Sequence, residues 1–215
     1  MAYYDNERPE IFPHLPENCD RLLDIGCGQG RVAQGVASIK KVSWTGGVEL
    51  MPDAAAEAEK HMDRVWTGAI DDADLEAEIE PGSLNAILCL DVLEHLVDPW
   101  SVVKRLSPLI APGGRLIVSV PNIRHWRFIR NLFLKGDFHY VDAGLLDRTH
   151  LRFFVRETAE ELTTCGGLSL EGSYDTRSYT ERAFDMRRLM IKATGGWAAD
   201  VTAKQWIIVG ERPGA

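Results

Sequence analysis

The sequence lacks three features, each of which would assign it to a broad class of protein. No run of lysine and arginine is longer than two residues and the net charge is −8, so a basic, phosphate-binding surface and a nucleic-acid partner are not expected. The apolar stretches reach only about ten residues, too few to span a bilayer. The N-terminus has neither the basic nor the apolar region of a signal peptide. We therefore expect a cytoplasmic protein with no membrane span.

Cysteine is also scarce, and its spacing argues against the common metal and disulfide motifs. The four cysteines are Cys19, Cys27, Cys89 and Cys165, and no two of them form a CxxC pair. Cys27 and Cys89 lie in apolar, strand-like segments. Buried free thiols are therefore expected in place of a zinc site or a disulfide framework.

The sequence is rich in a regular alternation of strand-like and helical segments. With 215 residues and 45% hydrophobic content, the chain has room for one α/β domain and a modest insertion. Strands are expected at 21–27, 42–50, 64–69, 83–91, 113–121, 168–174 and 204–212. Helices are expected at 29–39, 52–63, 97–110, 124–135, 156–165 and 181–192. This alternation predicts a doubly wound, mostly parallel seven-stranded sheet.

The strongest local signal is the stretch Asp24 to Gly30, D-I-G-C-G-Q-G, whose glycines come at the end of the first expected strand. Glycines in this place let the backbone approach a ligand with no Cβ in the way. A dinucleotide fingerprint that starts at Gly26 would need a third glycine at position 31, where the chain has Arg31. The NAD-binding interpretation is therefore disfavoured.

This G-x-G-x-G loop, with an acidic residue on the preceding strand, resembles the first motif of class I S-adenosylmethionine-dependent methyltransferases. The resemblance extends through the later strands and implies a Rossmann-like fold, methyl transfer as the activity and S-adenosyl-L-methionine as the cofactor. It also implies that Asp24 orients the methionyl end of the cofactor, and that Ile70 and Asp71 flank the adenine. Glu49 ends the second strand about 20 residues after the glycines, where a carboxylate can accept both ribose hydroxyls.

The run LDVLEHL, residues 90–96, resembles the fourth motif of the same family, with Asp91 facing the cleft and Val92 beside it. The expected cofactor-binding residues are thus Asp24, Gly26, Cys27, Gly28, Gly30, Glu49, Leu50, Ile70, Asp71, Asp91 and Val92. Asp91, Glu94 and His95 also resemble clusters that bind a divalent metal in ubiquinone O-methyltransferases and small-RNA 2′-O-methyltransferases. Here Asp91 replaces the usual glutamate and the sequence places no further ligand. A histidine that packs and caps locally is preferred, and no metal is expected.

After Pro121 the alternation breaks, and residues 136–150 have no clear period. We interpret residues 1–215 as a single domain with an N-terminal cap at 1–20, in which Tyr4 and Arg8 help to close the site, and an acceptor-binding insertion at 122–155. The insertion contains N-x-x-H-W and D-x-T-H-L-R-F-F stretches. These resemble bacterial methyltransferases of surface-polysaccharide and glycan gene clusters, and the first half also resembles the methyltransferase-like protein of methionine biosynthesis.

Methyl transfer to a hydroxyl needs a base, and a histidine with a pKa near ~6.5 suits that role. The candidates are His95, His125, His139 and His150. His150 is the expected base, with Asp147 three residues earlier to fix its tautomer if the turn is helical. The alternative is that Thr149 and His150 anchor the following segment. His125 is expected to pack or to bind substrate.

The leading prediction is O-methylation of a sugar, glycan or other small hydroxylated molecule, as in polysaccharide biosynthesis. Two alternatives stay open: a quinone or phenol O-methyltransferase, and a non-catalytic regulatory partner that binds the cofactor. A homodimer is compatible with either activity. Aromatic residues of the insertion can stack on a ring of the acceptor or fill a core; they are Trp126, Phe138, Tyr140, Phe153 and Phe154.

Overall fold

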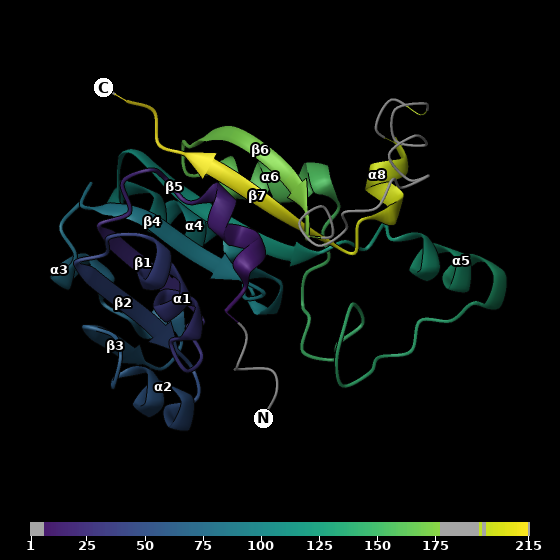
Figure 1. Cartoon of the computed structure of the whole chain (residues 1–215). Helices are drawn as coiled ribbons and strands as arrows, with labels where there is room; N and C mark the ends of the chain where they lie inside the picture. Colours follow the sequence, from purple (N-terminus) through teal and green to yellow (C-terminus); the bar gives the residue numbers. More distant parts are fainter. Residues whose placement is uncertain (1–6, 177–193, 195–196, 215) are drawn as a thin grey trace.

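A computed structural model describes residues 7–176, 194 and 197–214, and these contain one seven-stranded sheet in the order β3-β2-β1-β4-β5-β7-β6. The strands are β1 (Arg21–Ile25), β2 (Trp44–Glu49), β3 (Arg64–Thr67), β4 (Leu84–Leu90), β5 (Ile110–Pro121), β6 (Ser169–Asp175) and β7 (Gln205–Glu211). Neighbouring strands are parallel from β3 to β5, and β7 runs antiparallel to both β5 and β6. The predicted mostly parallel sheet is confirmed (Figure 1).

Helices cover both faces of this sheet. The α-helices are α1 (Arg31–Ile39), α2 (Pro52–Ala58), α3 (Leu75–Glu78), α4 (Pro99–Leu106), α5 (Trp126–Lys135), α6 (Arg156–Thr164) and α8 (Trp197–Thr202). Short 3-10 turns are η1 (Pro9–His14), η2 (Ile70–Asp72), η3 (Leu93–His95) and η4 (Ser107–Leu109). The helix expected at 181–192 lies outside the described residues.

The central strands are buried on both faces, as their continuous apolar runs predict. Successive side chains of a strand point to opposite faces. Accordingly, Leu23 and Ile87 pack in one hydrophobic cluster, and Leu22 and Leu88 pack in a second one. Because the strand order reverses between β1 and β4, the carboxyl ends of these two strands form the crevice where a doubly wound sheet binds its ligand.

Helix α2 ends at Ala58, five residues before the end of the helix expected from the sequence. The physical reason is that Asp63, the last residue of the expected helix, bonds to Thr45 of β2 instead. Its carboxylate accepts hydrogen bonds from the backbone N–H of Thr45 at 2.7 Å and from the Thr45 hydroxyl at 3.1 Å. These bonds attach the chain at Asp63 to β2, so the helix ends before it reaches Asp63.

The insertion after β5 is built differently from the sheet. Helix α5 has no buried residue, and Figure 1 shows it well away from the strands. Phe138 holds this part together through ring contacts with Phe128 and Tyr140 at 5.7 Å and with Phe153 at 6.2 Å between centroids. Phe154, in contrast, is buried in the main core. Phe138, Phe153 and Phe154 thus have packing partners within the protein, and the stacking of these rings on an acceptor stays a prediction.

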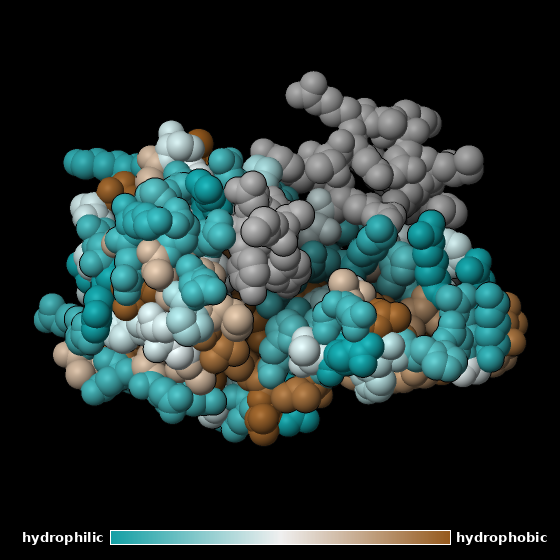
Figure 2. Space-filling model, turned by 90° about the horizontal axis from the view of Figure 1, so that it is seen from below, coloured by the Kyte–Doolittle hydropathy of each residue, from teal (hydrophilic) through white to brown (hydrophobic). Residues whose placement is uncertain are grey.

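Apolar side chains remain on the surface of this part of the chain. Phe133 of α5 is 85% exposed and Leu134 is 69% exposed. Figure 2 shows apolar surface at the end of the molecule where Figure 1 places α5, and more of it near the middle of the same face. Within the described residues, no helix has the length and apolar character needed to cross a membrane.

The cysteines carry free thiols in the structure. Cys19, Cys27 and Cys89 are buried as expected, whereas Cys165 is only half-buried. Burial raises the pKa of Cys19 to about 11, and it also raises the pKa of Cys27 and Cys89. These three thiols are therefore protonated packing groups at neutral pH.

Candidate active site

The glycine loop connects β1 to α1 and packs against Val92, just after the end of β4. Gly26, Gly28 and Gly30 all have positive φ, at 74°, 55° and 79°. A Cβ added to Gly26 would lie only 2.4 Å from Cγ2 of Val92. Only glycine combines this backbone conformation with so close an approach. The two predicted cofactor motifs are thus in direct contact at the crevice between β1 and β4.

Glu49 lies at the end of β2, buried beside the same loop. One carboxylate oxygen accepts the backbone N–H of Gly28 at 2.8 Å, and the other accepts the backbone N–H of Met51 at 2.8 Å. Each oxygen keeps a further lone pair, so the carboxylate can also accept ribose hydroxyls. Its assignment to the ribose stays a prediction, and the loop contact shows why the side chain is well positioned for it.

Asp24 is buried beneath the loop, where one of its carboxylate oxygens has no hydrogen-bond partner among the described residues. Burial raises the pKa of Asp24 to about 7, and the nearby Glu49 carboxylate adds to this shift, whereas Arg8 opposes it. An unsatisfied acceptor at this depth is costly. It is the kind of site that a cationic or hydrogen-bond-donating ligand would stabilise.

Arg8 of the N-terminal cap reaches the end of β4. Its guanidinium contacts a carboxylate oxygen of Asp91 at 2.5 Å and the Ser119 hydroxyl at 2.9 Å, and the other Asp91 oxygen accepts a hydrogen bond from Gln205. Arg8 and Asp91 are also the two non-glycine residues with positive φ in the described chain. Strained backbone of this kind is concentrated at functional sites. The sequence had singled out Arg8; it gave no sign of Gln205.

The other predicted cofactor residues lie in mixed surroundings. Cys27 is buried, and its thiol packs against Gly47, where an added Cβ would lie 2.5 Å from the sulfur. Leu50 is 64% exposed beside Glu49. Ile70 is buried in the main core and Asp71 is exposed on η2. Ile70 is thus already packed within the protein, and its predicted contact with adenine stays a prediction. Tyr4 lies outside the described residues.

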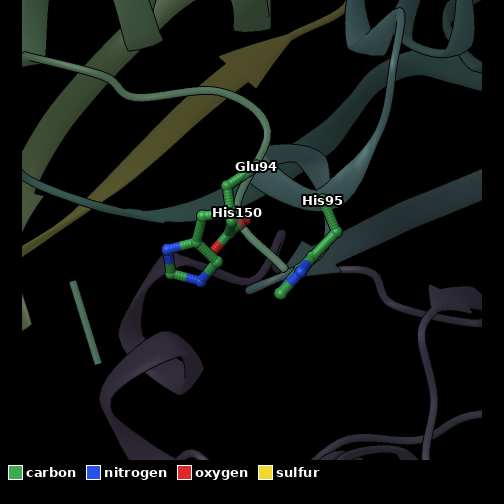
Figure 3. Close-up of side chains that lie close together, drawn as sticks. All are labelled: Glu94, His95 and His150. Atoms are coloured by element: carbon green, nitrogen blue, oxygen red, sulfur yellow. The ribbon is translucent and has the colours of Figure 1, made fainter. Parts of the chain in front are cut away.

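A second group of three side chains meets near the carboxyl end of β4, and two of them come from the turn that follows Asp91. Glu94 and His95 of η3 meet His150 of the insertion, and one potential ligand atom of each lies within 4.8 Å of those of the others (Figure 3). Glu94 is 1% exposed, and its Oε2 atom has no hydrogen-bond partner among the described residues. Burial raises the pKa of Glu94, with the Asp91 carboxylate as the second cause. The carboxyl is poised to take up a cation or to hold a proton.

The two imidazoles are close and differently held. Their ring centroids lie 4.7 Å apart, edge to face. Burial, and then the proximity of His150, lowers the pKa of His95, which favours the neutral ring. Nδ1 of His150 lies 3.1 Å from the carbonyl oxygen of Leu145. Because a carbonyl can only accept, this nitrogen carries the hydrogen and the lone pair of the ring is on Nε2.

The backbone of the insertion is tied to η3 at this point. The N–H groups of Leu151 and Arg152 both donate to the carbonyl oxygen of Glu94, at 2.8 and 3.0 Å. The Arg152 side chain donates to the carbonyl oxygen of Val97. These contacts bring the T-H-L-R stretch to the end of β4. They place His150 beside Glu94 and His95, a position that sequence spacing alone did not predict.

Asp147 does not orient His150 as the sequence suggested. Its carboxylate accepts hydrogen bonds from the backbone N–H and the hydroxyl of Thr149, at 2.9 and 2.7 Å. These bonds lower the pKa of Asp147, the backbone bond being the larger cause. The three-residue spacing predicted a helical turn, but this segment is not helical. The carboxylate therefore pairs with the nearer Thr149.

The remaining candidate bases lie apart from the cluster. His125 is buried next to Trp126, with ring centroids 6.2 Å apart, which fits its expected packing role. The side chain of His139 is 89% exposed and pairs with Asp137 at 2.7 Å. Of the four candidate histidines, His95 and His150 are the pair that the structure brings together.

The same arrangement of sheet and glycine loop occurs in a known family. A family model described as a methyltransferase domain matches residues 2–170. This chain belongs to that methyltransferase family. The membership confirms the predicted class I, S-adenosylmethionine-dependent type of domain and its cofactor, S-adenosylmethionine.

Individual relatives are more distant. A ubiquinone biosynthesis O-methyltransferase of Xanthomonas euvesicatoria is 28% identical over 166 residues, which cover 70% of this chain and 66% of the relative. The matching region thus spans just under two thirds of that relative's length. Among solved structures, S-adenosylmethionine-dependent methyltransferases of Archaeoglobus fulgidus and Mesorhizobium loti have TM-scores of 0.64 and 0.62, with 14% and 15% identity. The alignments cover 95% of this chain in both cases, and 91% and 96% of those chains. These two similarities establish the fold.

Proposed function

We propose that this chain transfers the methyl group of S-adenosylmethionine to a hydroxyl oxygen of a small acceptor, bound over Glu94, His95 and His150. The observation that carries the proposal is the convergence of these three side chains directly after Asp91 and Val92, at the carboxyl end of β4. Groups that can accept a proton are thereby gathered next to the predicted cofactor site. A hydroxyl acceptor needs such groups, because its oxygen must lose a proton when it is methylated.

The proposed reaction is an in-line displacement. A lone pair of the acceptor oxygen forms a bond to the methyl carbon, and the carbon–sulfur bond breaks with its electron pair going to sulfur, which leaves S-adenosylhomocysteine. The acceptor's proton goes to His150, whose Nε2 lone pair is available because Nδ1 is bonded to Leu145. Holding acceptor and cofactor in line supplies much of the rate.

The same three residues form a donor set that fits a divalent cation. One carboxylate and two imidazoles are ordinary ligands for zinc and related metals, and the buried Glu94 oxygen without a partner would be satisfied by a cation. No metal was expected because the sequence placed no ligand beyond Asp91, Glu94 and His95. His150 supplies that ligand, while Asp91 is engaged by Arg8 and Gln205. A bound cation would make a coordinated hydroxyl more acidic.

Two acceptor classes have support of different kinds. A phenolic or quinol-type hydroxyl is favoured by the metal-compatible donor set and by relatives named ubiquinone biosynthesis O-methyltransferases. A sugar or glycan hydroxyl, as in polysaccharide biosynthesis, is favoured by the resemblance of the segment from Pro121 to Phe154 to methyltransferases of glycan gene clusters. We rank the phenolic acceptor first, since two independent observations support it.

The direct test is the formation of S-adenosylhomocysteine from S-adenosylmethionine with a panel of catechols, hydroquinones and nucleotide-linked sugars. We expect turnover with a catechol or hydroquinone, and loss of turnover in His150→Gln. His139→Gln is the matched control, because His139 is exposed and lies apart from the cluster, and it should retain full activity. Cofactor binding without methyl transfer to any acceptor would contradict the proposal and favour the non-catalytic regulatory partner.

Chelation separates the two ways in which the cluster can work. Loss of turnover in EDTA, restored by Mg²⁺ or Zn²⁺, would assign Glu94, His95 and His150 to a metal site. Unchanged turnover in EDTA would leave the histidine alone as the base.

A further inference from the structure

We propose that Thr149 and Asp147 are positioning residues that hold His95 in one tautomer, with the hydrogen on Nδ1 and the lone pair on Nε2. The inference rests on the proposed function in one respect: it gives the lone pair a use in the cluster with Glu94 and His150. The tautomer itself follows from hydrogen-bond geometry alone.

The relevant contacts form a short chain. Asp147 Oδ1 lies 2.7 Å from the hydroxyl oxygen of Thr149 and 2.9 Å from the Thr149 backbone nitrogen. The same hydroxyl oxygen lies 3.0 Å from Nδ1 of His95, and the carbonyl oxygen of Thr149 lies 3.2 Å from that nitrogen. His95 Nδ1 thus faces two oxygens of one residue, and that residue is fixed by Asp147.

Counting hydrogens decides the tautomer. An ionised carboxylate has no hydrogen to give, so the single hydroxyl hydrogen of Thr149 is directed to Asp147. Towards His95 the hydroxyl oxygen therefore presents a lone pair, and the Thr149 carbonyl can also only accept. Both partners of Nδ1 are acceptors, so Nδ1 must carry the hydrogen. The nitrogen of His95 that can accept a proton or bind a cation is then Nε2.

His150 provides an internal comparison. It is held in the same tautomer, but by the backbone carbonyl of Leu145 at 3.1 Å, which no side-chain substitution at Asp147 removes. The backbone carbonyl of Thr149, at 3.2 Å, also favours this tautomer of His95, but the shorter contact of His95, to the Thr149 hydroxyl at 3.0 Å, is directed by Asp147. A change at Asp147 should therefore alter the tautomer of His95 and leave that of His150 as it is.

The variant Asp147→Ala removes the acceptor of the Thr149 hydroxyl, which can then donate to Nδ1 of His95 and stabilise the opposite tautomer. Asp147→Asn is the matched control, because its side-chain oxygen can still accept both hydrogens from Thr149. The readout is the set of ring ¹⁵N chemical shifts of His95 and His150 at pH 8. Loss of the respective signals in His95→Gln and His150→Gln assigns them.

We expect the wild type and Asp147→Asn to show His95 protonated on Nδ1, and Asp147→Ala to show a second population protonated on Nε2. The His150 signals should be unchanged in all three proteins. The methyl-transfer rate should fall on the order of 10-fold in Asp147→Ala only, with unchanged cofactor affinity, since partners of functional histidines commonly contribute that much.

Two results would overturn the inference: a wild-type His95 protonated on Nε2, or equal loss of rate in both Asp147 variants with the His95 tautomer unchanged. The NMR measurement needs no acceptor. The expected shifts without methyl transfer to any hydroxyl would therefore contradict the proposed function and leave the positioning role intact.

Discussion

The two sides of the candidate active site are made in different ways. On the cofactor side, strand ends bring Gly26 within the reach of Val92 and Glu49 within hydrogen-bond distance of Gly28. On the acceptor side, the insertion contains a helix with no buried residue and is joined to Glu94 by backbone hydrogen bonds from Leu151 and Arg152. The cofactor side is thus built from the ends of buried strands, and the acceptor side from an exposed segment attached to the sheet edge by backbone hydrogen bonds.

The largest effect is expected on the cofactor side, for Gly26→Ala. We expect cofactor binding to become undetectable by calorimetry, because the new Cβ would meet Val92 at 2.4 Å and φ is 74°. Gly144→Ala is the matched control: Gly144 also has a positive φ, 96°, but nothing lies within 4 Å of an added Cβ. It should bind the cofactor normally. Wild-type affinity in Gly26→Ala would show that the contact is not needed.

The next largest effect concerns pH. Burial raises the pKa of Asp24 to about 7, whereas an unfolded aspartate titrates near ~3.9. Between these values the folded state holds a proton that the unfolded state has released. The free energy of unfolding of the cofactor-free protein should therefore fall as pH rises, by up to about 4 kcal/mol, with the loss complete above pH ~7.

Urea denaturation at pH 5 and pH 8 measures the part of this fall that lies above pH 5, about 3 kcal/mol, and Asp24→Asn isolates the contribution of Asp24 because it removes the titration. We expect a flatter pH dependence in Asp24→Asn than in the wild type. Identical pH dependence in the two proteins would contradict the assigned shift.

A smaller effect is expected for Glu49→Ala. Since Glu49 is predicted to accept the ribose hydroxyls of the cofactor, its loss should weaken binding by about 1.5–3 kcal/mol, measured by titration calorimetry. Glu59→Ala, at an exposed position just after α2, should bind the cofactor as the wild type does. If Glu49→Ala also binds normally, the ribose assignment is wrong.

The smallest effect is expected on the surface of α5. Phe133 is 85% exposed and Phe154 is 3% exposed, although both belong to the insertion. Phe133→Ser should change the free energy of unfolding by less than about 0.5 kcal/mol, while Phe154→Ala should lower it by about 3–5 kcal/mol. Thermal or urea denaturation checks both values. A large loss in Phe133→Ser would show that α5 is packed more closely than its exposure indicates.

Local sequence patterns predicted the strand and the glycine turn of the cofactor side, because these are built from neighbouring residues. The apolar run before Asp24 specifies a buried strand, and the glycines after it specify a turn that only glycine adopts. Glu49 follows from the end of the next strand. The same logic does not reach Arg8 and Gln205 at Asp91, because that network joins residues from opposite ends of the chain.

The contacts of His150 and Asp147 were predicted only in part. The sequence singled out His150 and Asp147, but it paired them with each other because they are close in the chain. In the structure His150 meets His95, 55 residues away, and Asp147 bonds to Thr149. Backbone bonds from Leu151 and Arg152 to Glu94 create this meeting. Such bonds leave no periodicity or motif by which sequence reasoning could find them.

We propose that His150, Glu94 and His95 serve the methyl-transfer step, whereas the glycine loop and Glu49 serve cofactor binding. The most direct measurement compares cofactor affinity with the single-turnover rate of methyl transfer in His150→Gln across pH 5.5 to 9. We predict unchanged affinity and a rate lowered about 10²–10⁴-fold, as is typical when a general base is lost. A rate within about threefold of the wild type, with folding and affinity intact, would contradict the account.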